Sequence, residues 1–290
     1  MIGKKISPVI VIGMHRSGTS LLSEILQGMG VFMGADLEEN NESEFFTEIN
    51  DWLLKQAGVC WLEPASFNYI SDDFKSVMAE IVRNRLKTYH RNKYLGKHKK
   101  NKNLTDLDFA WGWKDPRNTF TWEIWKEIFP EAKIIHLYRN PVDVVSSLNV
   151  REPKSIFFTG NPTRTGLKKK LLGYFLPSKR IFIHSFRSMS LYGSFEFWKE
   201  YVSKALTVNE KCPDKILHLK YEDLLSNPEK SLVCILSFLQ MELDSPTLKK
   251  LTSFINPERR FAFRGNEKYE TFYLEIKNDP LLVRLKYNNI

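Results

Sequence analysis

The stretch PVIVIGMHRSGTSLL, residues 8–22, decides the fold of this 290-residue chain. Residues 8–13 form a short apolar run rich in Val and Ile, which is typical of a buried parallel strand. Residues 19–29 have the apolar spacing of a helix. Gly13 and Gly18 lie between the two, so the stretch predicts a strand, a glycine-containing turn and a helix. In such turns backbone N–H groups and the helix N-terminus face an anion.

The spacing of this turn, with four residues between Gly13 and Gly18, matches a Walker A phosphate loop. Walker A requires Lys at the next position, where this chain has Thr19, and the positive side chain stands instead at Arg16. A nucleoside triphosphate usually needs Mg²⁺ as well as that Lys. The loop therefore favours a ligand with less charge here, held by Arg16 and backbone amides without a metal. The alternative is a tight turn with an incidental Arg.

The rest of the chain alternates short apolar runs with helical spacing. Strands are predicted at 111–116, 133–139 and 215–221, and helices at 51–56, 72–89, 119–129, 142–150, 195–210, 229–239 and 246–255. This order predicts an α/β fold of the three-layer, P-loop NTPase-like kind, with a central parallel sheet flanked by helices. We expect one domain over 1–290, with an inserted loop or lobe at about 153–190, where Pro, Gly and basic residues show little period.

Two motifs give the chain a resemblance to the sulfotransferases that use 3′-phosphoadenosine 5′-phosphosulfate (PAPS). HRSGTS, residues 15–20, resembles the loop of the family's bacterial and carbohydrate-directed branch. YRNPVDVVSSL, residues 138–148, resembles the segment in which an Arg at a strand end and a Ser eight residues later bind the 3′-phosphate, here Arg139 and Ser147. A cation at the end of a parallel strand lies beside the crevice where ligands bind, and it makes charge-assisted hydrogen bonds to phosphate.

A third motif, LKYEDLLSNPEKSLVCILSFL at 219–239, resembles the family segment whose Tyr lies near the adenine, here Tyr221. The resemblance implies transfer of a sulfuryl group from PAPS to a hydroxyl or amine of an acceptor, a glycan or other metabolite. The product would be adenosine 3′,5′-bisphosphate (PAP), and no metal would be needed. The alternative is a P-loop kinase-like phosphotransferase using ATP, which the missing Walker Lys disfavours.

The resemblance also implies roles in transfer, where positioning and charge stabilisation do most of the work. Arg16 would hold the leaving oxygen and the 5′-phosphate, together with the amides of Ser17, Gly18, Thr19 and Ser20. Lys114, in WKDPR, resembles the family's strand Lys that meets the transferring group. Arg117 and Asp115 are expected to pair with each other as structural residues.

The acceptor hydroxyl needs a base late in transfer. The His that serves in the cytosolic enzymes is absent, because Pro116 stands at its position. Carbohydrate-directed relatives use a Glu in the stretch that corresponds here to residues 36–51. We favour Glu48, at an expected helix start beside an aromatic pair, while the sequence leaves three other carboxylates open: Glu42, Glu44 and Asp115.

Composition narrows the partners. Lys and Arg number 43 against 34 Asp and Glu, a formal net charge of +9 that suits an anionic ligand. Basic residues at 167–180 suggest an acidic acceptor such as an acidic glycan, or alternatively a membrane surface. A basic module for nucleic acid would give no reason for the ordered motifs, so no nucleic acid is expected.

No apolar run reaches the roughly 18–20 residues of a membrane span. Wide spacing of Cys60, Cys212 and Cys234 favours small core thiols in a reducing, cytoplasmic location. Nothing indicates the oligomeric state.

Overall fold

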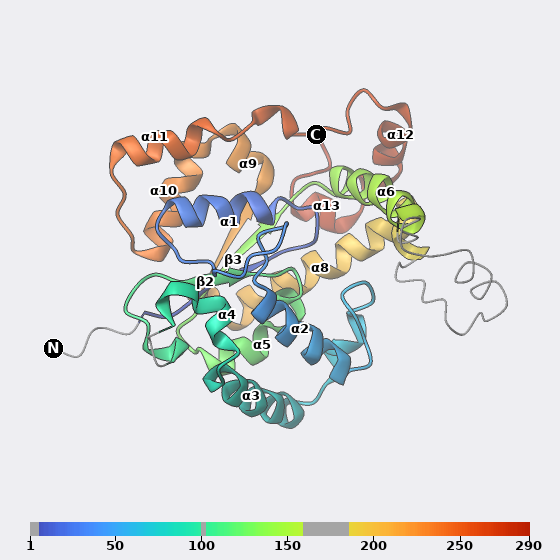
Figure 1. The fold of residues 1–290 in the computed structure, drawn as a ribbon. Coiled ribbons are helices and arrows are strands. Elements are labelled where there is room, and N and C mark those ends of the chain that lie inside the picture. Colours follow the sequence, from blue (N-terminus) through green and yellow to red (C-terminus); the bar gives the residue numbers. More distant parts are fainter. Residues whose placement is uncertain (1–5, 100–102, 159–185) are drawn as a thin grey trace, which may run out of the picture. The chain divides into compact units, whose positions relative to one another are not determined.

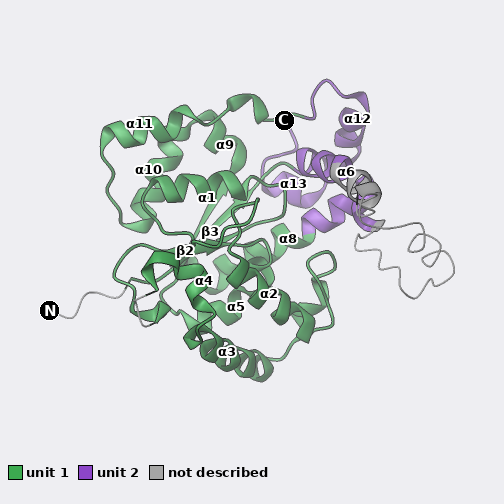
Figure 2. Cartoon of the chain, viewed as in Figure 1, with its two compact units in different colours: residues 1–140, 200–262 green, residues 141–199, 263–290 purple. Residues whose placement is uncertain are grey.

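The computed structural model describes residues 6–99, 103–158 and 186–290, traced in Figure 1. The chain divides into two compact units, coloured separately in Figure 2. Unit 1 comprises 1–140 and 200–262, and unit 2 comprises 141–199 and 263–290. Most of the inserted region expected at 153–190 lies outside the described residues, so the single-domain organisation stays a prediction. Helix α6 (Pro141–Phe158) covers the first part of that region, where we expected a loop.

Unit 1 is built on a parallel sheet whose described strands run in the order β2-β1-β3-β4. Their bounds are Gly112–Lys114 for β2, Val9–Ile12 for β1, Lys133–Tyr138 for β3 and Ile216–Lys220 for β4. All four residues of β1 are buried, as a central strand covered on both faces requires. Each strand falls inside a predicted stretch, so the α/β class with a central parallel sheet is confirmed.

Helices cover both faces of this sheet (Figure 1). On one face lie α1 (Thr19–Gly28), α9 (Tyr221–Ser226), α10 (Pro228–Leu239) and α11 (Ser245–Ser253). Leu22 and Ile25 of α1 share one apolar core with Ile135 of β3 and Leu232 of α10. The other side holds α2 (Glu44–Gln56), α3 (Asp72–Lys87), α4 (Arg91–Leu95) and α5 (Asn118–Ile128).

Helix α2 starts at Glu44, seven positions before the helix start that we predicted at residue 51. The Ser43 side chain accepts the first-turn N–H of Phe46 and so caps the helix. The ring of Phe46 stacks on Trp113 of β2, with centroids 4.0 Å apart and planes at 3°. Burial of this pair fixes α2 beside β2, and an acidic, Asn-rich flank concealed the signal in the sequence.

Unit 2 contains α6, α12 (Glu267–Ile276), α13 (Pro280–Arg284) and the start of α8 (Leu191–Lys211), whose later part belongs to unit 1. Lys199 pairs with Asp279 at 3.3 Å, and Asp143 accepts the backbone N–H of Phe263 at 2.8 Å. The described chain also has short 3₁₀ helices at Ala65–Tyr69, Gly96–His98, Leu104–Asp106, Phe186–Met189, Pro213–Lys215 and Pro257–Arg259.

The cysteines do not pack in the core as expected. Cys60 and Cys234 are exposed and Cys212 is half-buried, and all three are free thiols. Cys234 lies on the outer face of α10, because the buried positions of that helix are Leu232, Ile235, Leu236 and Leu239. In the described ranges no helix has both the length and the apolar character needed to cross a membrane.

Candidate active site

The loop between β1 and α1 has the backbone of an anion-binding turn. Gly13, Arg16 and Gly18 have φ angles of 142°, 69° and 93°, all in a region that residues with a Cβ rarely adopt. A Cβ on Gly13 would lie 2.4 Å from the carbonyl oxygen of Leu137 on β3, so only glycine fits there. Thr119 of α5 fixes the loop by accepting the N–H of Gly13 at 3.1 Å.

The predicted anion donors of the loop do not all have the same role. Ser17 is buried, and both its N–H and its hydroxyl donate to the carbonyl of Met14, at 3.2 and 2.6 Å. Ser20 donates its hydroxyl to the carbonyl of Asn40 at 2.8 Å. The amides of the first turn of α1 have no partner within the helix, so those of Thr19 and Ser20 remain suited to an anion. Arg16 is exposed at the crest of the loop.

Tyr221 connects this loop to the end of β3. Its ring is buried against Gly18, since a Cβ on Gly18 would lie 2.3 Å from Cε2 of Tyr221. The guanidinium of Arg139 lies over the same ring, 4.7 Å from its centroid, and donates to the carbonyl of Arg259 at 2.9 Å. A single aromatic ring therefore contacts both the loop and Arg139. The structure brings these three predicted residues together.

Lys114, at the end of β2, is paired with Glu42. Its Nζ lies 2.9 Å from Oε1 of Glu42, and its side chain is only 1% exposed. Arg117 approaches the other oxygen of Glu42 at 3.4 Å. Glu42 belongs to the segment 36–51 in which we expected the base, and it contacts the predicted transfer lysine. The two cations hold its carboxylate at the carboxyl end of a parallel strand, where ligands of such sheets bind.

Arg117 holds the middle of a larger network. It pairs with Asp115 at 2.8 Å, as we expected, and with Asp51 of α2 at 2.5 Å. Burial lowers the pKa of Arg117, but the carboxylates of Asp115 and Asp51 raise it by more, so the guanidinium stays charged. Asn50 donates to Asp115 at 2.7 Å and ties α2 into the same network. These contacts fix the position of Glu42 through a rigid, buried support.

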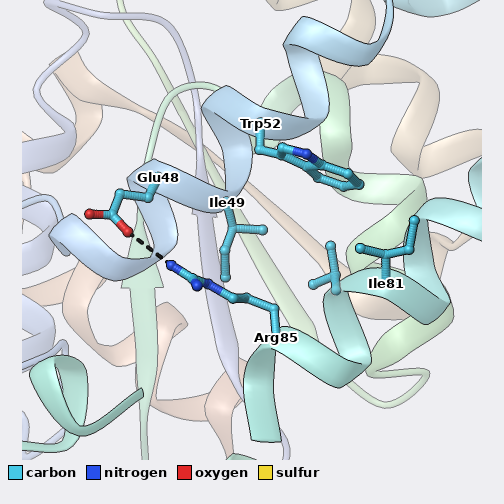
Figure 3. A pocket seen from close by; sticks show the side chains of 6 residues that line it. Glu48, Ile49, Trp52, Ile81 and Arg85 are labelled. Carbon is cyan, nitrogen blue, oxygen red and sulfur yellow. Dashed lines mark hydrogen bonds and ion pairs between the residues drawn. The ribbon is translucent and has the colours of Figure 1, made fainter. Parts of the chain in front are cut away.

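Glu48, our preferred base, lies elsewhere on α2. Its carboxylate is 3.3 Å from Arg85 of α3 and 3.6 Å from Lys93. Figure 3 shows it turned toward Arg85 at the edge of a pocket of about 350 Å³ between α2 and α3, where Trp52 and Ile81 form apolar walls. Glu44 also pairs with Lys93, at 3.4 Å. Both carboxylates thus pair with surface cations, whereas Glu42 contacts Lys114.

Ser147 lies on α6 in unit 2, and its role toward a phosphate stays a prediction.

His15, in the loop, packs its ring on Trp61, with centroids 4.3 Å apart, and lies 6.2 Å from the ring of Tyr201. Burial, with the nearby charge of Asp115, raises the pKa of Tyr201 well above its usual range, so its phenol stays protonated and donates to the carbonyl of Trp61 at 2.9 Å. These ring contacts support a packing role for His15.

Sequence reasoning missed two residues beside this site. Asn140 is fully buried after Arg139, and its backbone N–H and its side-chain amide each donate to Oε1 of Glu222 at 3.0 Å. The adjacency of Glu222 to Tyr221 in the sequence KYED was the available signal. The signal becomes informative only with the pairing of β3 and β4, which places Tyr138 opposite Lys220.

Comparison with known proteins gives one informative match. A model of the family described as "Sulfotransferase family" matches residues 8–165, just over half of the chain. A search of curated proteins found no match.

Several solved structures are distantly similar. The sulfotransferase domain of the Synechococcus PCC 7002 olefin synthase is 20% identical over 88% of this chain and 82% of that chain, with a TM-score of 0.44. The sulfotransferase domain from the curacin biosynthetic pathway is 16% identical over 94% and 92%, with a TM-score of 0.47. Mouse sulfotransferase SULT7A1 complexed with PAP is 15% identical over 97% and 88%, with a TM-score of 0.43. At these TM-scores the likenesses support no argument about this chain.

Proposed function

Since the chain belongs to the sulfotransferase family, we propose that it transfers a sulfuryl group from PAPS to a hydroxyl or amine of an acceptor. The observation that supports this donor most strongly is the contact of Tyr221 with both Gly18 and Arg139. A nucleotide with phosphates on its 5′ and 3′ positions needs two anion sites at a short separation. The loop and Arg139 are suited to be two such sites, because both contact the ring of Tyr221.

The donor would be held by residues from four parts of unit 1. Arg16 and the amides of the first turn of α1 are suited to the 5′-phosphate, because N–H groups and the helix dipole favour an anion there. Arg139 is suited to the 3′-phosphate and Tyr221 to the adenosine. Ser147 is proposed as a further ligand of the 3′-phosphate. No described residue is assigned to a metal, and independence of metal remains part of the proposal.

Lys114 and Glu42 are proposed as the pair that serves the transfer itself. The ammonium of Lys114 would stabilise charge that builds on the sulfuryl oxygens and the leaving oxygen. Glu42 would accept the proton that the acceptor loses. Its contact with Lys114 supports this choice over Glu48, the residue that the sequence favoured.

The acceptor is proposed to be a glycan or another metabolite, with acidic glycans favoured by the net charge of +9. The basic stretch 167–180 that suggested an acidic acceptor lies outside the described residues. A cytoplasmic location is likewise proposed from the sequence alone.

Thermal unfolding with added nucleotides tests the donor. A ligand that binds the folded state raises the unfolding temperature by mass action. PAP should raise it more than ATP with Mg²⁺ at the same concentration, and Arg16→Ala and Arg139→Ala should each remove most of the PAP effect. Stabilisation by ATP with Mg²⁺ but not by PAP would favour the phosphotransferase alternative. An undiminished PAP effect in both variants would remove the assignment of these two arginines.

A further inference from the structure

We propose that Glu222 is a positioning residue that gives the donor site its preference for a 3′-phosphate, by fixing the Arg139–Asn140 dipeptide. The inference rests on the proposed function, because it takes Arg139 as the group that binds that phosphate. Glu222 is buried and lies at the start of α9, directly after β4.

The pairing of β3 with β4 brings the two dipeptides together. The strands are parallel, and their register ends with Tyr138 opposite Lys220. Arg139 and Asn140 follow Tyr138, and Tyr221 and Glu222 follow Lys220, so the two dipeptides leave the sheet at neighbouring points. The contacts agree with this register, since Arg139 stacks on Tyr221 and Asn140 binds Glu222. Two consecutive residues after β4 thus hold two consecutive residues after β3.

Glu222 holds Asn140 through two hydrogen bonds. Oε1 of Glu222 accepts the backbone N–H of Asn140 and its side-chain amide, each at 3.0 Å. Asn140 is fully buried and Glu222 is 3% exposed. A buried donor without a partner is costly, so removal of this carboxylate should displace the Asn140 backbone. Arg139 is the adjacent residue, and its backbone would move with it.

Helix α9 also supports a second contact of Arg139, with the carbonyl of Arg259. Arg139 donates to the carbonyl of Arg259, in the short 3₁₀ helix Pro257–Arg259. The next residue, Arg260, donates to the hydroxyl of Ser226 at 2.6 Å, and that hydroxyl donates to the carbonyl of Glu222 at 2.7 Å. The six-residue helix α9 therefore makes three contributions. Tyr221 lies under Arg139, Glu222 holds Asn140, and Ser226 binds Arg260, the residue after Arg259.

This arrangement predicts that loss of Glu222 weakens binding of the 3′-phosphate and leaves binding of the 5′-phosphate unchanged. A guanidinium that is already held in place loses less side-chain entropy when it binds a phosphate. The loop that is proposed to face the 5′-phosphate is also fixed by contacts that do not involve α9, through Thr119 and Met14. Loss of Glu222 should therefore weaken binding of PAP and leave binding of adenosine 5′-monophosphate (AMP), which lacks the 3′-phosphate, nearly unchanged.

The test is calorimetric titration of the whole protein with PAP and with AMP, for the wild type, Glu222→Ala and Glu222→Gln. In Glu222→Ala the ratio of PAP affinity to AMP affinity should fall by about tenfold or more, as loss of a buried hydrogen-bond partner implies. Glu222→Gln keeps Oε1 as an acceptor and should restore most of the ratio. A matched control is Glu229→Ala, an exposed carboxylate on α10, which should leave the ratio at its wild-type value.

An unchanged ratio in Glu222→Ala would overturn the inference and leave the proposed function intact. If that variant does not fold, Glu222→Asp decides, because its shorter side chain withdraws the carboxylate from Asn140. A lowered ratio there supports the inference and a wild-type ratio overturns it. If the wild type itself binds PAP no better than AMP, the proposed 3′-phosphate site fails and the inference fails with it.

Discussion

Gly18 occupies a position where geometry and packing both require glycine. Its φ is 93°, and a Cβ would lie 2.3 and 2.5 Å from two carbons of the Tyr221 ring. Gly58 also has a positive φ, of 67°, but nothing lies within 4 Å of its Cβ position. A substitution at Gly58 therefore tests backbone strain alone, whereas the same substitution at Gly18 tests strain together with a steric clash at the predicted nucleotide site.

We expect Gly18→Ala to lower the free energy of unfolding by about 3 kcal/mol, from strain together with forced displacement of a packed ring. Gly58→Ala should cost only about 1 kcal/mol, because strain alone applies. Urea unfolding measures both values, and PAP titration should show weakened binding for Gly18→Ala alone. Equal losses of stability in the two variants would mean that the Tyr221 ring does not press on Gly18.

Glu42 is the residue on which the proposed chemistry can be tested most simply. Glu42→Gln keeps the shape and removes the base, so kcat should fall on the order of 100-fold while affinity for PAP changes little. Glu39→Gln, an exposed member of the same acidic segment, is the matched control and should keep its kcat. Steady-state sulfuryl transfer to the same acceptor measures both.

The variant Glu48→Gln completes that comparison. A large drop in kcat there, with normal turnover in Glu42→Gln, would restore the sequence-based choice of Glu48 and contradict the assignment drawn from the Lys114 contact. The sequence could not make this distinction, because Glu42 and Lys114 are 72 positions apart and only the folded chain brings them to 2.9 Å. An acidic run gives no sign of which of its members faces a strand end.

Among the elements, one carboxylate joins α3, α5 and the unit 1 part of α8. Glu123 of α5 pairs with Lys75 of α3 at 2.7 Å and with Lys211 of α8. Burial alone would raise the pKa of Glu123, but hydrogen bonds from Lys211 and Lys75 lower it to about 2. Since the folded state binds its proton less readily than the unfolded chain, the stabilisation is present at neutral pH and is lost as pH falls from about 4.5 toward 2.

Glu123→Gln should therefore lower the free energy of unfolding at pH 7 by about 1–2 kcal/mol, a value reduced for the partial exposure of the lysines. The difference from the wild type should persist down to about pH 5 and then narrow. Urea unfolding at pH 7, 4 and 3 follows it. A difference that is constant across this range, or that grows on acidification, would contradict the ion-pair explanation.

Strands were predictable here and helix boundaries less so. A strand of a covered parallel sheet is largely apolar, so β1, β3 and β4 appear in the sequence as short stretches rich in Val, Ile and Leu, with one His in each of β3 and β4. Helix α2 depends on Phe46 packing against Trp113, a contact between distant segments, and its charged flank resembles a loop. Helices α12 and α13 went unpredicted, although Asp279 caps α13 by accepting the N–H of Leu281 at 2.9 Å.

At the scale of the molecule, unit 1 carries most of what the proposal needs. The loop, Lys114, Glu42, Tyr221 and Arg139 all belong to it, whereas Ser147 belongs to unit 2. The loop and the strand-end Arg were predictable, because turn chemistry and strand ends are local signals. The ring that joins them was predictable only as one member of a motif, because its contacts with Gly18 and Arg139 come from segments far apart in the chain.

The most direct test of the central claim is a crystal structure of the protein grown with PAP. The account predicts one nucleotide that spans the two anion sites of unit 1, with its 5′-phosphate at the amides that begin α1 beside Arg16 and its 3′-phosphate on the guanidinium of Arg139. Electron density that places the nucleotide with either phosphate away from these groups would contradict it.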